Sequence, residues 1–380
     1  MSDGSRLASV LVAYRQAYGV SQSALADILG VDQSYISKIE RGRRVIRDVQ
    51  FLKRVVDRLG VQPFQIGLSI DAFAGKADQD ILQLSNSVIS LAITARNSGH
   101  PEKAIQELQP LLIRLYGQSH PNASDVTLLR TIVSAKIALG TALGDLLPQE
   151  RLREAGKELL EALEIFTHIE KAAQKGHSAV KTELLRKIGN EMRKQGSLSG
   201  AGDFLERSLA RDRDDASRGS AALCLARLRA NQRDHRAFAQ ALRIATGCLD
   251  RVTHFSPTFN PIAVNEVRLR GLLQLGRLTE TQIEHVSGQA AIGLAPHWSI
   301  IREVTIAEAW MSVGNTSDAA AYAGRAIDGA LLCKLPRQIS RVKQAIDKSK
   351  SSAIEEVAAK ANKALKALTP YSQMVWPRTA

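Results

Sequence analysis

The sequence has few aromatic residues, prolines and cysteines. Aromatic side chains make up 4% of its 380 residues, and 11 residues are proline. Strands favour aromatic and β-branched residues, whereas helices exclude interior proline, so this composition predicts packed helices. The three cysteines lack motif spacing and predict buried free thiols without a disulfide framework, with a redox sensor as the alternative.

Motifs that carry catalysis or bind cofactors are also missing. The eight histidines form no His-x-x-x-His pair. There is no Ser-centred nucleophile elbow and no Gly-rich phosphate loop after a strand. We therefore predict that the protein is not an enzyme and has no catalytic residue, metal site or cofactor. A site assembled across the fold would leave no such motif.

Nothing in the sequence predicts secretion or membrane insertion. No apolar run approaches the roughly 18 residues that a spanning helix needs. Arg6 and Arg15 interrupt the first helical stretch, which has no small-residue cleavage site. We expect a cytoplasmic, nucleoid-associated protein without a membrane partner.

The net charge is +13 and is spread along the chain. Residues 1–65 hold ten Lys and Arg against six Asp and Glu, which gives +4, and the remainder contributes +9. The total charge therefore favours a polyanionic partner only weakly. A local cluster is the stronger indication of phosphate binding, and it consists of Arg41, Arg43, Arg44 and Arg47.

A stretch near the N-terminus predicts two short helices joined by a tight turn. Ser21 is placed to cap the first helix, and Gly30 ends it where a left-handed conformation is needed. Asp32 begins the second helix, again as a cap, with Ile36 and Ile39 facing inward. The other face of this helix is short and polar, and it can both donate and accept hydrogen bonds. Such a face can read base edges in a major groove.

This region resembles the DNA-binding domain of the lambda-type (XRE, Cro/repressor) helix-turn-helix family over residues 7–65. The matching residues, in order, are Arg15, Ser21, Gln22, Leu25, Ala26, Gly30, Ile36, Ile39, Glu40 and Gly42. Flanking helices are predicted at residues 6–18 and 48–59 and would close a small core. The alternative is a solvated helical hairpin with a charged end.

The resemblance implies roles for individual residues. Gln22 would anchor on phosphate and brace the recognition helix, Gln33 would be the leading base reader, and Arg15 with Glu40 would form an internal ion pair. The predicted DNA-contacting residues are Gln22, Gln33, Ser34, Tyr35, Ser37, Lys38, Arg41, Arg43 and Arg44. Because serine discriminates bases poorly, specificity would rest partly on DNA shape.

The DNA-binding domain is predicted to span residues 1–68, and a linker follows at residues 69–80. Beyond the linker the sequence predicts paired helices. The clearest unit spans residues 184–212, where Gly189 lets a neighbouring helix approach, Gly196 makes the turn and Ala201 is small at the crossing. Successive turns at Gly196, Gln232, Gly276 and Gly314 are 36, 44 and 38 residues apart.

This pattern resembles tetratricopeptide repeats and implies about six helical hairpins over residues 81–332. The alternative is an irregular helical bundle. Residues 333–380 are basic and carry one apolar stripe, formed by Ile354, Val357, Ala361, Ala364 and Leu368. A capping helix is the default interpretation, and dimerisation is the alternative.

In tetratricopeptide proteins the first helix of each hairpin lines a concave groove. Basic and amide residues fall at groove positions in several units, which favours an anionic ligand or a short peptide. The predicted ligand-binding residues are Arg96, Asn97, Arg186, Asn190, Arg193, Arg229 and Arg270. The alternative is that these residues are the solvated faces of amphipathic helices.

The sequence therefore predicts an all-α protein, with an N-terminal helix-turn-helix domain followed by a right-handed α-solenoid and a C-terminal capping helix. The combination resembles regulators that respond to quorum peptides. It implies a homodimer on a palindromic operator in double-stranded DNA, with affinity changed by a signalling peptide or small anionic ligand. The alternative function is an interaction scaffold that docks a protein, which the DNA-binding domain brings to promoters.

Overall fold

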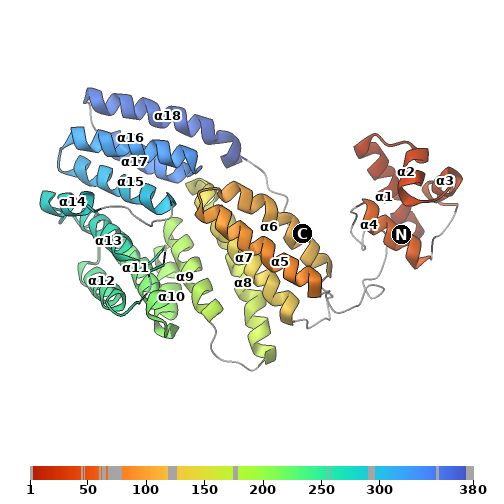
Figure 1. The fold of residues 1–380 in the computed structure, drawn as a ribbon, viewed down its shortest axis with the longest axis horizontal. Coiled ribbons are helices and arrows are strands. Elements are labelled where there is room, and N and C mark those ends of the chain that lie inside the picture. The colour runs from red at the N-terminus through yellow and green to blue at the C-terminus, as the bar shows by residue number, and fades with distance from the viewer. Residues whose placement is uncertain are drawn as a thin grey trace. The chain divides into compact units, whose positions relative to one another are not determined.

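The fold is known from a computed structural model of the chain (Figure 1). The residues it describes are 3–43, 46, 48–59, 61, 66, 79–118, 126–173, 179–253, 255–256, 258–289, 296–347 and 351–373. These residues form helices and no strand, apart from an isolated bridge between Ser256 and Phe259. The chain divides into two compact units, residues 1–79 with 114–125, and residues 80–113 with 126–380.

The first unit contains four helices around one small core. They are α1 (Asp3–Tyr18), α2 (Gln22–Leu29), α3 (Gln33–Glu40) and α4 (Val49–Leu59). Each helix contributes apolar residues at spacings of three and four, and the fully or nearly fully buried ones include Leu11, Leu25, Leu29, Ile36, Ile39, Phe51 and Val55. The four predicted helices and their inward faces are confirmed.

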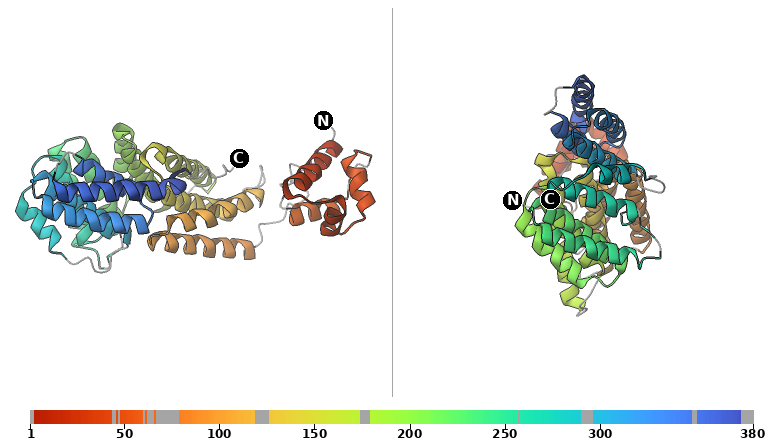
Figure 2. Two further views of the ribbon diagram at one scale, coloured as in Figure 1. Left: turned by 90° about the horizontal axis from the view of Figure 1, so that it is seen from above. Right: turned by 90° about the vertical axis from the view of Figure 1, so that its left-hand side faces the viewer.

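The second unit is a series of antiparallel helical pairs (Figures 1 and 2). The pairs are α5 (Gln79–Asn97) with α6 (Pro101–Gln118), α7 (Val126–Leu146) with α8 (Leu152–Ala173), α9 (Ala179–Lys194) with α10 (Leu198–Arg211), α11 (Asp215–Asn231) with α12 (His235–Leu249), α13 (Pro261–Gln274) with α14 (Glu280–Ser287), α15 (Pro296–Ser312) with α16 (Thr316–Leu332), and α17 (Pro336–Ile346) with α18 (Ser352–Gln373). A short 3-10 helix, η3 (Gln149–Arg151), precedes α8. The predicted all-α fold with helical hairpins after the N-terminal domain is confirmed. Of the predicted linker, only Gln79 and Asp80 are described, and they open α5.

The first helices of consecutive pairs pack on one another and form an inner layer. Contacts join α7 to α9, α9 to α11, α11 to α13, α13 to α15 and α15 to α17. Helix α17 in turn contacts α7. We call these six helices, α7, α9, α11, α13, α15 and α17, the inner ring.

The close helix crossing predicted at Gly189 is present. A Cβ at this position would lie 3.1 Å from the carbonyl oxygen of Ala201 and 2.7 Å from Leu205. The turns at Gly196, Gly276 and Gly314 all have positive φ, as expected for the residue that reverses a hairpin.

One predicted turn is wrong by a residue. The left-handed residue between α11 and α12 is Arg233, with φ of 59°, rather than Gln232. Its backbone N–H donates to the carbonyl of Ala230, the same pattern as Gly196 to Arg193. No glycine marked this turn in the sequence, so its register could not be fixed there.

Helix α7 is long and apolar enough to cross a membrane by length and composition, a result that the sequence prediction did not anticipate. It is the only such helix among the described residues, and 61% of the apolar window is buried inside the protein. Its neighbours are the helices of the repeat array, and we interpret it as a core helix.

The C-terminal helix α18 packs on α16 and α17. Its apolar stripe is buried there, with Ile354 at 1% and Leu368 at 3% exposure. The stripe is therefore occupied by the same chain, which agrees with the capping interpretation and makes the stripe unavailable for dimerisation. The three cysteines are free and buried.

Candidate functional site

The turn between α2 and α3 is fixed by local hydrogen bonds. The hydroxyl of Ser21 accepts from the backbone N–H of Ala24 at 3.1 Å, and Gly30 is left-handed with φ of 66°. Asp32 occupies the N-cap position of α3, but its side chain makes no capping hydrogen bond. The predicted cap at Ser21 is thus confirmed, and the predicted side-chain cap at Asp32 is wrong.

The outward face of α3 is polar and open to solvent. Gln33, Ser34 and Lys38 are exposed, and Ser37 is half-buried. Arg41 and Arg43, which follow the helix, are exposed as well. Arg44 lies outside the described residues.

A chain of polar contacts holds this face in place. Arg15 donates two hydrogen bonds to the Glu40 carboxylate, from Nε at 2.7 Å and from Nη2 at 3.1 Å. Gln22 donates to the same carboxylate at 2.5 Å, and its own amide oxygen accepts from Gln33 at 3.1 Å. The hydrogen bond to Glu40 raises the pKa of Arg15. The first residue of α3 is therefore oriented by a network anchored on α1.

Tyr35 packs its ring on the core of the domain, and its contact with DNA stays a prediction. Its ring packs edge-on against Phe51 of α4, with centroids 5.2 Å apart, and the residue is half-buried. The ring supports the core of the domain, so we leave Tyr35 out of the proposed base readers.

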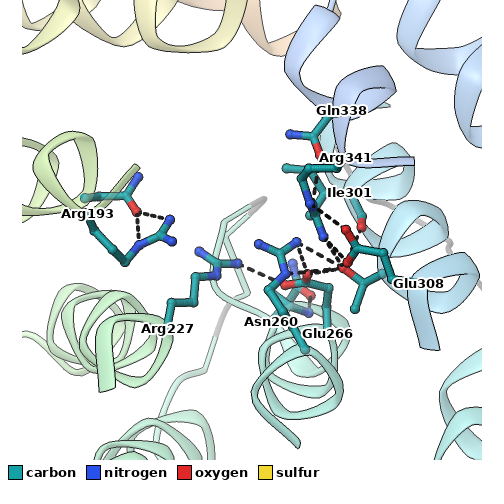
Figure 3. A network of polar contacts seen from close by, with 12 residues as sticks. Arg193, Arg227, Asn260, Glu266, Ile301, Glu308, Gln338 and Arg341 are labelled. Carbon is teal, nitrogen blue, oxygen red and sulfur yellow. Dashed lines mark hydrogen bonds and ion pairs between the residues drawn. The ribbon is translucent and has the colours of Figure 1, made fainter. Parts of the chain in front are cut away.

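The second unit encloses a cavity of about 690 Å³. All six helices of the inner ring contribute to its lining, together with Arg96 of α5. The prediction that the first helix of each hairpin faces the groove is in line with this arrangement. Figure 3 shows part of the wall, where Arg227, Glu266, Glu308 and Arg341 lie close together.

Five of the predicted ligand-binding residues line this cavity, namely Arg96, Arg186, Asn190, Arg193 and Arg270. Asn97 does not line it, and its side-chain oxygen accepts from Arg96 at 3.2 Å. Arg229 does not line it either, because it pairs with Glu206 and donates to Gln232 at 2.8 Å. On α11 the cavity is lined by Arg227, which lies six residues before the turn residue Arg233, as Asn190 lies six residues before Gly196.

The cavity also holds charged residues that the sequence analysis missed. They are Asp145, Glu150, Lys187, Glu191, Lys194, Arg227, Glu308, Arg337 and Arg341, with Glu266 directly behind the wall. Lys187 and Lys194 are seven residues apart, and Asn190 lies between them at spacings of three and four. This helical spacing could have indicated that they share one face of α9. Arg337 and Arg341 were assigned to the C-terminal cap, where nothing in the sequence placed them near the groove.

Two carboxylates in this region are strongly stabilised as anions. Burial alone would raise the pKa of Asp145, but Arg96, with Nε 2.7 Å from the carboxylate, and the nearby charges of His297 and Lys194 lower it to about 2. Burial likewise opposes the charge of Glu266, yet the pKa of Glu266 is lowered to about 2 by Arg270, Arg227 and Arg341. Both acids are ionised at neutral pH.

Several cations lack such compensation. Arg193 donates only to the amide oxygens of Asn190 and Asn231, at 3.0 and 3.2 Å, and Arg337 donates to Gln149 at 3.2 Å. Burial, followed by the charges of Arg227 and Arg337, lowers the pKa of Arg193 to about 9. Burial and Arg341 lower the pKa of Arg337 to about 10. Lys187 is partly compensated, since its ammonium lies 3.5 Å from the Glu183 carboxylate, but burial still lowers its pKa to about 8.

The comparisons with known proteins bear on the N-terminal unit. Residues 6–65 match a family model described as a helix-turn-helix domain. The first unit contains a helix-turn-helix domain. No curated protein matches the chain. Among solved structures, PlcR of Bacillus thuringiensis in complex with the peptide PapR7 and DNA aligns over 96% of this chain and 95% of its own, with 12% identity and a TM-score of 0.26.

The described residues contain no group of three or more His, Cys, Asp or Glu that could hold a metal ion. The charged lining of the cavity instead fits the binding of an anion by hydrogen bonds and charge.

His297 at the cavity wall predicts acid sensitivity. It is 8% exposed, and its Nδ1 has no hydrogen-bond partner among the described residues. Burial lowers the pKa of His297 from 6.5 to about 4. The charges of Arg96 and Lys194 lower this pKa as well, whereas Asp145 raises it. The unfolded chain therefore binds an extra proton between pH 6.5 and 4, and stability falls as the pH falls through this window, by up to about 3 kcal/mol. Urea unfolding of His297→Gln should show a flatter pH dependence there than the wild type. Parallel curves for the two proteins would contradict this assignment.

Proposed function

We propose that the chain is a sequence-specific DNA-binding transcriptional regulator whose helical array binds a peptide or small anionic ligand and thereby changes operator affinity. The observation that carries the proposal is the exposed polar face of α3, with Gln33 held by Gln22 and the arginines Arg41 and Arg43 beside it. Arginine, lysine and amide side chains on such a helix can contact phosphates and base edges. The chain would act on nucleoid DNA inside the cell.

In the proposed complex Gln33 reads a base, and Ser34, Ser37 and Lys38 lie on the same side. Gln22 and the flanking arginines hold phosphates. Because Gln22 contacts both Glu40 and Gln33, it can fix the reader before DNA arrives. An ordered reader loses less conformational freedom on binding, which favours affinity.

Base reading and phosphate anchoring can be separated by mutation. Gln33→Ala should relax preference at one position of each half-site, at a cost of about 1–3 kcal/mol for the preferred sequence. Arg43→Ala should weaken all sequences alike and reduce the slope of log affinity against log salt by about one unit. Fluorescence anisotropy on a panel of sites from genome-wide mapping measures both effects.

Gln16→Ala is the matched control, since Gln16 is exposed on α1. It should leave both affinity and specificity unchanged. Identical behaviour of Gln33→Ala and Arg43→Ala would refute the division into reader and anchor, and wild-type protein that ignores DNA at low salt would refute the proposed function.

The array would dimerise and place two helix-turn-helix domains on a palindrome, about 34–36 Å apart or a multiple of that distance. Ligand binding in the cavity would alter the geometry of the inner ring and thus the spacing. A tenfold change in operator affinity requires a coupling free energy of only about 1.4 kcal/mol. Light scattering gives the oligomeric state, and DNA binding with and without the ligand gives the coupling.

A protein-docking scaffold is the second candidate function. Helix α5 exposes apolar side chains, with Leu84 at 63% and Leu91 at 68% exposure. Such residues can form part of a protein interface. A protein that co-purifies in fixed ratio, and is lost with Leu84→Asp and Leu91→Asp, would favour this function over ligand sensing.

A further inference from the structure

The cavity is bounded by a closed ring of helices. Contact between α17 and α7 completes the inner ring. The Lys334 ammonium pairs with Glu102 of α6, and Arg337 of α17 donates to Gln149 beside η3 at 3.2 Å. The cavity has a volume of about 690 Å³, which is in the size range for a small molecule.

The charge of the lining is unbalanced. Its basic residues are Arg96, Arg186, Lys187, Arg193, Lys194, Arg227, Arg270, Arg337 and Arg341, and its acidic residues are Asp145, Glu150, Glu191 and Glu308.

Most of these acidic side chains form ion pairs with particular cations of the lining. Asp145 pairs with Arg96, Glu191 with Lys194, and Glu308 with Arg341. Glu266 lies behind the wall and forms ion pairs with Arg227 and Arg270. Positive charge therefore accumulates on the remaining wall.

Arg193 and Arg337 are the clearest uncompensated pair. Each makes hydrogen bonds to amide oxygens and to no carboxylate among the described residues. They come from α9 and α17, the two ring helices that contact α7, and they line the same cavity. After burial and Arg227, the charge of Arg337 lowers the pKa of Arg193 further. Both side chains are half-buried, and partly desolvated cations are usually paired, so this arrangement favours an anionic ligand.

We propose that the cavity binds a small molecule carrying a phosphate-type oxyanion, clamped between Arg193 and Arg337. This inference rests on the proposed function, whose ligand it narrows to one chemical class. A phosphate group offers three or more oxygens and close to two negative charges, so it can accept from two guanidinium forks at once. A carboxylate offers two oxygens and one charge and would satisfy only one fork fully.

The clamp also links the ligand to the closure of the ring. Arg337 is on the same helix that contacts α7, and it already donates to Gln149 there. An oxyanion held by both Arg193 and Arg337 would tie α9 to α17. Binding would thus stabilise the ring of helices, through which the proposed function lets a ligand change DNA affinity.

The test uses the full chain with inorganic pyrophosphate, inorganic phosphate and a nucleoside diphosphate as probes, at constant ionic strength. Calorimetry should detect binding of at least one phosphate probe, and the melting temperature should rise with it. Arg193→Gln and Arg337→Gln should each weaken this binding at least tenfold. Tighter binding of the diphosphate ester than of the inorganic ions would identify an organic phosphate as the ligand, and the reverse would identify the free ion.

Arg229→Gln is the matched control, because Arg229 is an arginine on α11 that pairs outside the cavity. It should bind the probes like the wild type. Without ligand, Arg193→Gln should melt at or above the wild-type temperature, since it removes an uncompensated charge. A lower melting temperature with unchanged probe binding would show a structural role and overturn the proposal.

The two proposals fail in distinguishable ways. If no phosphate probe binds but a peptide with a free carboxylate changes DNA affinity, the phosphate inference is wrong and the proposed function stands. If the phosphate probes bind through Arg193 and Arg337 but the protein ignores DNA, the proposed function is wrong and the site remains.

Discussion

Glu266→Gln is expected to lower the free energy of unfolding by about 3–5 kcal/mol. Glu266 is 1% exposed and lies among Arg227, at 3.1 Å, the guanidinium of Arg270, and the hydroxyl of Thr305, which donates to it at 2.7 Å (Figure 3). Glutamine has the same shape but no charge. The substitution would therefore remove the carboxylate that pairs with both arginines, while changing the packing little.

Urea unfolding at neutral pH measures this effect. Glu206→Gln is the control, since Glu206 is 54% exposed in its pair with Arg229 and should change stability by less than about 1 kcal/mol. An equal loss of unfolding free energy in both variants would show that the buried Glu266 pairs are no more stabilising than an exposed ion pair.

The same residue predicts a pH dependence. The pKa of Glu266 is about 2 in the folded protein and 4.5 in its reference state. The unfolded chain thus binds more protons between these values, and the stabilisation is complete above pH 4.5 and lost as the pH falls toward 2. Glu266→Gln should lack this part of the acid-induced loss.

The N-terminal domain could be predicted from sequence in considerable detail because its signals are local. Ser21 and Gly30 mark the ends of α2 by backbone chemistry that needs no tertiary context. Ile36 and Ile39 face inward because of helical periodicity. The pairing of Arg15 with Glu40 came from the family resemblance, and the structure shows it directly.

The cavity was less predictable because its residues meet only through the closing of the array. On α11 the residue three before the expected turn, Arg229, was predicted to face the groove, whereas Arg227 lines the cavity. Arg337 reaches the cavity because α17 returns to contact α7, a long-range contact that leaves no pattern in the sequence. The stripe of α18 was readable, since its period is helical, but whether it met the same chain or another was not.

Lys136 is a buried charged residue in the apolar helix α7, and the hydrophobic pattern of the sequence did not reveal it. The sequence around it in α7 is apolar enough to resemble a membrane span. In the structure the Lys136 side chain is fully buried, and its ammonium lies 2.7 Å from Glu158 and 2.6 Å from Glu161 of α8. These acids point toward α7 because they lie three residues apart on one face of α8. A charge cluster therefore joins the two helices of this hairpin.

Lys136→Ala should accordingly lower the free energy of unfolding by about 3–5 kcal/mol, because it removes a buried side chain and leaves two carboxylates facing each other. Lys157→Ala is the matched control, since Lys157 is 69% exposed and 3.5 Å from Glu161, and it should cost less than about 1 kcal/mol. The triple variant Lys136→Met, Glu158→Gln, Glu161→Gln should recover most of the loss, since it removes the whole charge cluster and keeps the volume. Urea unfolding distinguishes the cases: if the triple variant is as unstable as Lys136→Ala, then lost packing rather than unpaired charge explains the effect.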